Sequence, residues 1–245
     1  MTKQLLILTF LFTIIIRLSG QPQSYFPNLT RISVDTTYNV FFGYDKSTTR
    51  LINKPCYQLE KADPFHCYED SVPVTWIILA KFKNKSLKDS IYIVYSEGLS
   101  ADPVFEVSTK PDASTIIGSF YCLEFYINAS GTIYTSGHTN NMFNKRKKFQ
   151  LKNDTIVEVQ QPYLYVGMKG KTMKDVTLFK DKVGKTIVAQ LPKEYEIEIL
   201  LAESGTKDFE IETLFLVRTD FGLVGWLRLE GFGEQVLKDL YYAGD

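Results

Sequence analysis

The stretch that decides the fold is LVRTDFGLVGW, residues 216–226. Two apolar, strand-prone runs flank a turn that ends in Gly222, and glycine reaches positive φ because it has no Cβ atom to clash. The pattern predicts a β-hairpin. We expect Gly222, Gly225 and Trp226 to be structural residues, with the indole wedging the returning strand.

Further strands precede this hairpin. Residues 195–199 alternate apolar and charged side chains, which is the period of a strand with one buried face and one wet face. Residues 185–190 are also strand-prone, and Pro192 ends that run because proline cannot donate to a β-ladder. Short strands at this spacing predict a small β-barrel over residues 172–230.

The barrel region resembles the bacterial SH3-like domain. The resemblance is carried by Val176-Thr-Leu178, Gly184-Lys-Thr-Ile187, Leu191-Pro-Lys193, and residues 197–201, 216–218 and 222–226. It covers about the last quarter of the chain and implies a five-stranded barrel of a kind common in envelope proteins, where it often helps to bind peptidoglycan or peptide segments. The family's frequent Asn-x-Arg-x-Gly-Pro opening is replaced here by Leu-Phe-Lys-Asp at 178–181, and the polar loop 202–211 is longer than usual.

Residues 21–168 are predicted to form a β-rich meander or sandwich, so the whole chain is expected to be all-β. Their strand-prone runs show little helical periodicity, and turn sequences at 128–131 and 152–154 join neighbouring runs. The chain's 17 phenylalanines and 15 tyrosines are explained mainly by core packing, with a carbohydrate-stacking platform as the alternative.

The two ends of the chain predict export and a short terminal helix. Lys3, the apolar run 5–16 and a small-residue site before Gln21 are typical of a secretory signal peptide over residues 1–20, with an uncleaved tether as the alternative. No later segment is apolar for long enough to span a membrane after cleavage, so we expect a secreted or periplasmic protein. In residues 231–245, apolar side chains at helical spacing predict one short helix packed on the barrel: Val236, Leu237, Leu240 and Tyr241.

The charge balance and the cysteines limit which partners and covalent links we expect. Acidic and basic residues balance at 28 each, which argues against a nucleic-acid partner. In an exported protein, Cys56 and Cys67 are close enough in sequence to close a loop by a disulfide, while Cys122 lies in an apolar run and is expected to be a buried free thiol. The basic run 145–148 is interpreted as a solvated loop ahead of a strand, with an anion-binding patch as the alternative.

No catalytic, metal or cofactor site is predicted. His66 and His138 have no zinc-type spacing with the cysteines, and Cys122 lacks the helix-start context that activates a cysteine nucleophile. Scattered carboxylates leave a glycosidase pair open. Four Asn-x-Ser/Thr sequons are turn residues in a bacterium and glycan acceptors only in a host that glycosylates them: Asn28, Asn84, Asn128 and Asn153.

The expected function is therefore non-enzymatic binding of a cell-envelope component, either peptidoglycan or a peptide or protein segment. Barrel rims carry variable loops, so a groove is expected between loops 179–183 and 202–211, with Phe179, Tyr195 and Phe221 as candidate contacts. The alternatives are that Tyr195 and Phe221 fill the core, and that the chain is a cell-wall hydrolase with its active site in the N-terminal part.

Overall fold

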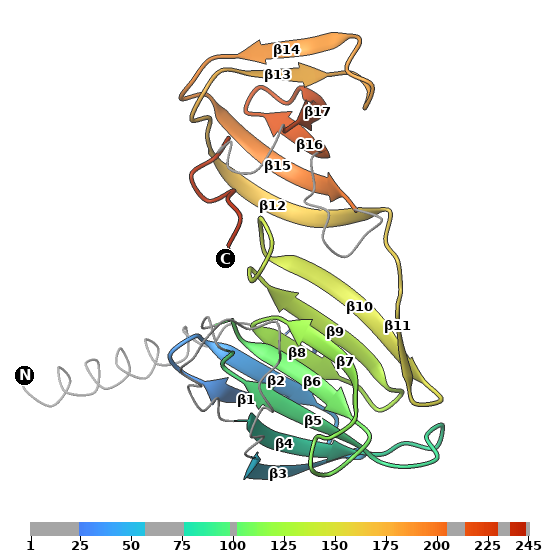
Figure 1. Ribbon diagram of the computed structural model, residues 1–245. Helices are drawn as coiled ribbons and strands as arrows, with labels where there is room; N and C mark the ends of the chain where they lie inside the picture. The colour runs from blue at the N-terminus through green and yellow to red at the C-terminus, as the bar shows by residue number, and fades with distance from the viewer. Residues whose placement is uncertain (1–24, 57–75, 99–101, 205–213, 230–235, 244–245) are drawn as a thin grey trace, which may run out of the picture.

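The computed structural model describes residues 25–56, 76–98, 102–204, 214–229 and 236–243. In this part of the chain there are seventeen strands in three sheets and no helix, which confirms the all-β class (Figure 1). None of these residues belongs to a helix long and apolar enough to cross a membrane. The signal peptide over 1–20, Cys67 and the side chain of Cys56 lie outside the described residues, so export and the disulfide stay predictions.

The first two sheets form the N-terminal lobe. One has the strand order β1-β2-β8-β9-β10-β11, and the other is the antiparallel meander β3-β4-β5-β6-β7. Strands β2 and β8 pair in parallel, with Phe41 opposite Glu124. The bounds are β1 Thr30–Asp35, β2 Val40–Tyr44, β3 Thr49–Cys56, β4 Trp76–Phe82, β5 Ile91–Ser96, β6 Val104–Ser108, β7 Ile116–Tyr121, β8 Glu124–Ile127, β9 Thr132–Gly137, β10 Lys145–Lys152 and β11 Thr155–Glu158.

The inner faces of these sheets share one aromatic core. Phe42 of β2, Phe105 of β6 and Phe125 of β8 are each 0% exposed. The ring centroids of Phe105 and Phe125 lie 5.1 Å apart, and those of Phe42 and Phe105 lie 6.5 Å apart. Because these rings come from both sheets, the lobe is a β-sandwich.

The third sheet forms the C-terminal lobe, with the order β12-β15-β16-β17-β13-β14 (Figure 1). Its edge strands β12 and β14 do not pair with each other within the described residues, so the expected closed barrel is not observed and the sheet is open. β12 also covers residues 168–171, which lie between the expected domains 21–168 and 172–230. The bounds are β12 Tyr163–Lys171, β13 Val176–Phe179, β14 Ile187–Leu191, β15 Glu196–Glu203, β16 Leu214–Thr219 and β17 Val224–Arg228.

The decisive hairpin is formed by β16 and β17. Gly222 has φ +97° and its N–H donates to the carbonyl oxygen of Thr219 at 2.9 Å, so the turn uses a conformation that side chains disfavour. Gly225 permits close approach to β13, because an added Cβ atom would lie 2.9 Å from the Cβ of Leu178. Local backbone geometry therefore explains why glycine occupies both positions.

The connection between β9 and β10 joins the two lobes. Met142 and Phe143 leave the sandwich and are buried in the aliphatic core of the C-terminal lobe. The ring of Phe143 lies 6.3 Å from that of Phe215 on β16, edge to face. The C-terminal lobe therefore depends on a segment of the N-terminal lobe for part of its core.

The described part of the C-terminal tail is a turn rather than the expected helix. Val236, Leu237 and Leu240 are at most 1% exposed, so the apolar spacing marks buried positions as expected. Leu240 N–H donates to the carbonyl oxygen of Leu237 at 3.1 Å, a single tight turn. Ala243 then forms an antiparallel bridge with Asn141, which requires extended backbone instead of a helix.

Candidate ligand groove

The described C-terminal lobe has a groove of about 300 Å³ between the β13–β14 turn and strands β16 and β17. The turn supplies one wall through Asp181, Lys182 and Val183. Trp226 and Arg228 of β17 supply the other. The groove is thus built where a hairpin turn leans over a neighbouring strand, a place where side chains can vary without disturbing the core.

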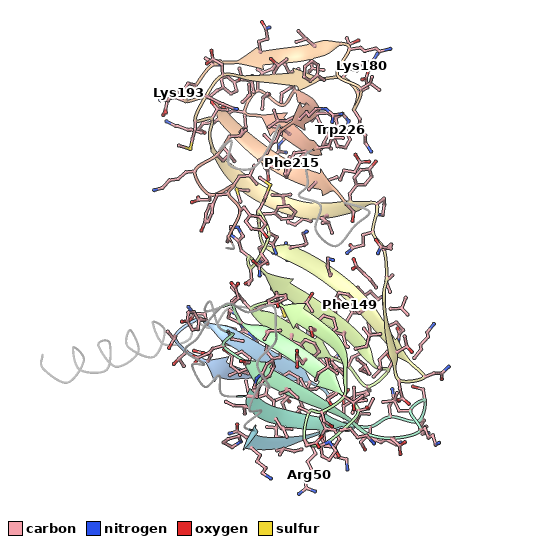
Figure 2. The ribbon with its side chains drawn as sticks, in the orientation of Figure 1. Arg50, Phe149, Lys180, Lys193, Phe215 and Trp226 are labelled. Atoms are coloured by element: carbon pink, nitrogen blue, oxygen red, sulfur yellow. The ribbon has the colours of Figure 1, made fainter. Side chains whose placement is uncertain are left out.

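Trp226 presents an aromatic surface to this groove. In β17 the neighbours Gly225 and Leu227 are buried, so the alternation of the strand turns Trp226 to the opposite face, where it is half-buried (Figure 2). Its ring lies 6.1 Å from that of Tyr163 at the start of β12, with 38° between the planes. Trp226 therefore lines the groove, and Tyr163 packs beside it without lining the groove itself.

Lys182 is held against both rings. Its Nζ lies 4.9 Å from each ring centroid, donates to Glu203 Oε1 at 2.7 Å, and lies 3.2 Å from the Tyr163 hydroxyl. The hydrogen bond to Glu203, followed by that to Tyr163, raises the pKa of Lys182 above its usual value. The ammonium group therefore stays charged and lies over both rings in a cation–π arrangement.

The turn that carries Lys182 is internally fixed. Asp181 Oδ1 accepts the N–H groups of Val183 and Gly184 at 3.0 and 3.1 Å. Arg228 donates from its guanidinium to the carbonyl oxygen of Lys182 at 2.8 Å. These bonds give the groove a defined shape and leave aromatic, cationic and anionic groups side by side, which suits a ligand with both apolar and charged parts.

The three predicted ligand contacts lie in different places in the structure. Phe179 lines the groove and pairs across the strands with Trp226. Tyr195 is half-buried against the aliphatic core, and its N–H donates to Thr172 Oγ1 at 3.0 Å. Phe221 is 83% exposed at the hairpin tip and does not line the groove. Residues 205–211, most of the second expected loop 202–211, lie outside the described residues.

Sequence reasoning missed Tyr163 and Lys182 and gave Trp226 only a structural role. A signal for Tyr163 was present, because Tyr163 and Tyr165 flank Leu164 in a strand-like alternation. The structure buries Leu164 at 3% exposure and exposes Tyr163 and Tyr165 at 38% and 57%. No such signal exists for Lys182, whose role depends on where its turn folds.

The cysteine weighed as a nucleophile is not suited to that role. Cys122 is a free thiol at 2% exposure, and burial raises its pKa, which opposes the thiolate form that a nucleophile needs. His138 Nε2 lies 2.9 Å from the carbonyl oxygen of Tyr241 in the tail. Within the described ranges, no group of three or more His, Cys, Asp or Glu side chains could hold a metal ion.

The basic run 145–148 is part of strand β10 and not a loop ahead of it. Arg146 and Lys148 lie opposite Ser136 and Tyr134 of β9, and Lys147 forms an ion pair with Glu158 at 3.0 Å. The prediction of a solvated loop was wrong because cross-strand pairing, which depends on distant residues, overrides local charge.

No protein-family model matches the chain, and no curated protein and no solved structure matches it.

Proposed function

We propose that this chain is an exported, non-enzymatic binding protein of the cell envelope, secreted or periplasmic after removal of residues 1–20. Residues 172–230 act as an SH3-like interaction module. Its groove binds peptide segments, and the stem peptides of peptidoglycan are the first expected ligands. The observation that supports this most directly is the half-buried Trp226 beside Tyr163 and Lys182.

The chemistry of the groove favours a peptide. The rings of Trp226 and Tyr163 offer apolar contact at little cost in side-chain entropy. Lys182 and Arg228 can interact with carboxylates, while Asp181 can interact with an amino group. Stem peptides carry carboxylates and amino groups on a short backbone, so both kinds of charge find partners in one groove.

The experiment measures binding of the purified mature chain to isolated peptidoglycan and to released stem peptides. Tyr163→Ala is the test variant, and Tyr121→Ala is the matched control, because Tyr121 is an exposed tyrosine at 55% on β7 of the other lobe. Losing one aromatic contact of about 1 kcal/mol should weaken binding about fivefold in the test variant alone.

Two results would contradict the proposal. Equal binding by both variants would remove the groove from the interaction. Release of soluble fragments from peptidoglycan by the chain would instead establish hydrolysis and place the active site elsewhere.

A further inference from the structure

A second and larger hollow lies on the outer face of the sandwich, remote in sequence from the ligand groove. It has a volume of about 530 Å³ and is lined by residues of the segment before β1, the β1–β2 turn, and strands β1, β8 and β9. We call it the sandwich pocket, and five of its residues carry the argument: Tyr25, Arg31, Asn39, Glu124 and Tyr126.

A partly exposed ion pair lies in this pocket. Arg31 donates to Glu124 Oε1 at 2.9 Å, and the two side chains are only 20% and 17% exposed. The Arg31 guanidinium also lies 3.4 Å above the centroid of the Phe41 ring, which fixes its plane. Arg31 Nε is fully buried and has no hydrogen-bond partner within the described part of the chain, so it is not the atom that a ligand reaches. A ligand instead meets the exposed part of the ion pair, where guanidinium N–H groups can donate and the Glu124 carboxylate can accept.

The floor of the pocket is neutral and rigid. Tyr126 is 2% exposed, and burial followed by the nearby Glu124 carboxylate raises its pKa to about 12. Its phenol is therefore protonated at neutral pH. The ring lies against Gly43 of β2, where an added Cβ would fall 2.1 Å from the Tyr126 ring. Any larger residue at Gly43 would push this floor out of place.

The rim carries an aromatic face and an amide. Tyr25 is 65% exposed, and the Arg146 guanidinium lies 5.8 Å from its ring centroid. Asn39 has φ 54° in the β1–β2 turn, which Asp35 stabilises by accepting the N–H of Thr37 at 2.7 Å. The rim thus places one exposed ring and one amide around a charge-balanced interior.

We propose that the sandwich pocket binds a neutral, hydroxyl-rich saccharide. A sugar hydroxyl can accept a hydrogen bond from Arg31 and donate one to Glu124. Because the two side chains balance each other's charge, the pair favours a neutral ligand. The apolar face of the sugar ring packs on Tyr25, and the Asn39 amide forms a hydrogen bond with a further hydroxyl or acetamido group. This site is independent of the ligand groove and goes beyond its proposed function.

To test this, the full mature chain is titrated with chitotetraose and, in parallel, with cellotetraose, and the affinity is measured by calorimetry. Tyr25→Ser removes the exposed ring and should weaken saccharide binding about tenfold through loss of its packing. Tyr121→Ser is the matched control, and it should leave binding unchanged. Lys182→Gln, in the ligand groove, should also leave saccharide binding unchanged.

Arg31→Met supplies a second variant that removes the donor. Its melting temperature is measured first, and Tyr25→Ser keeps the test decisive if Arg31→Met does not fold. Loss of binding in Tyr25→Ser with retention in both controls supports the proposal. No binding of either tetrasaccharide by the unmodified chain, or equal binding by Tyr25→Ser and Tyr121→Ser, overturns it.

Discussion

The two lobes use their aromatic side chains in opposite ways. In the sandwich, Phe42, Phe105 and Phe125 are fully buried and stack on one another. In the C-terminal lobe the core is mainly aliphatic, and Phe143 and Phe215 are its only fully buried rings among the described residues, while Trp226 and other aromatics reach the surface. Because an exposed ring adds little to stability, the buried rings of the sandwich indicate its core, while Trp226 and Tyr163 of the C-terminal lobe indicate a candidate binding surface.

The largest effect is expected in the sandwich. Phe105→Ala removes a side chain that is 0% exposed and stacks on Phe125 at 5.1 Å. The free energy of unfolding should fall by about 3 to 5 kcal/mol through lost burial and the cavity left behind. Urea unfolding measures it, with Tyr121→Ala as the exposed control. A loss below about 1 kcal/mol would contradict an aromatic core shared by the two sheets.

The next largest effect is expected from a substitution that tests whether the two lobes unfold independently. Phe143→Ala removes the ring that the sandwich places in the C-terminal core, so it should cost about 2 to 4 kcal/mol. Since this ring joins the lobes, the variant should also unfold in two steps by calorimetry, with the C-terminal lobe melting first. Single-step unfolding of a destabilised Phe143→Ala variant would mean that other contacts hold the lobes together.

A smaller, pH-dependent effect is expected where one polar contact joins the two sheets of the sandwich. Tyr95 of β5 donates its hydroxyl to Asp35 Oδ2 at 2.9 Å. Burial works against ionisation of Asp35, but this bond and the N–H groups of Thr37 and Tyr38 outweigh it, so the pKa of Asp35 lies below its ordinary value of 3.8. Its folded-state pKa is therefore the lower one, and the stabilisation is present above pH 3.8 and is lost as the pH falls below that value.

Asp35→Asn tests this linkage. The variant should melt at a lower temperature than the unmodified chain near neutral pH, and the difference should shrink as the pH falls below about 4. Melting temperature against pH is the measurement. A constant difference across the whole range would assign the effect to lost packing instead of charge.

The smallest effect is expected at the hairpin tip. Phe221→Ser replaces a ring that is 83% exposed and does not line the ligand groove. Stability should change by less than about 0.5 kcal/mol, and peptide binding should not change. Weakened binding in a folded Phe221→Ser variant would show that Phe221 contacts the ligand and that the binding surface extends to the hairpin.

The sequence predicts local structure better than the meeting of distant segments. The turn at Gly222 is encoded within a few residues, so the β16–β17 hairpin was found. The parallel pairing of Phe41 with Glu124 joins residues far apart in the chain, and no local pattern marks it. In the tail, the spacing of Val236, Leu237 and Leu240 identified buried positions but not their conformation, because the bridge to Asn141 requires extended backbone.

The candidate site follows the same rule. Phe179 was found because it lies beside a variable turn, and it lines the groove. Tyr163, Lys182 and Trp226 come from three separate segments, and only the folded sheet brings them together. Trp226 was expected to wedge the returning strand, and strand alternation, which buries Gly225 and Leu227, places its half-buried indole on the opposite face.

The most direct test of the account is the fluorescence of Trp226 during titration with stem peptide. The chain has two tryptophans, so Trp76→Phe leaves Trp226 as the single reporter. Burial of a half-exposed indole by a ligand should shift its emission to shorter wavelength, in a saturable manner that Tyr163→Ala weakens and Tyr121→Ala does not. Saturable binding of the peptide without any change in Trp226 emission would contradict the claim that the exposed aromatics of the C-terminal lobe form its binding surface.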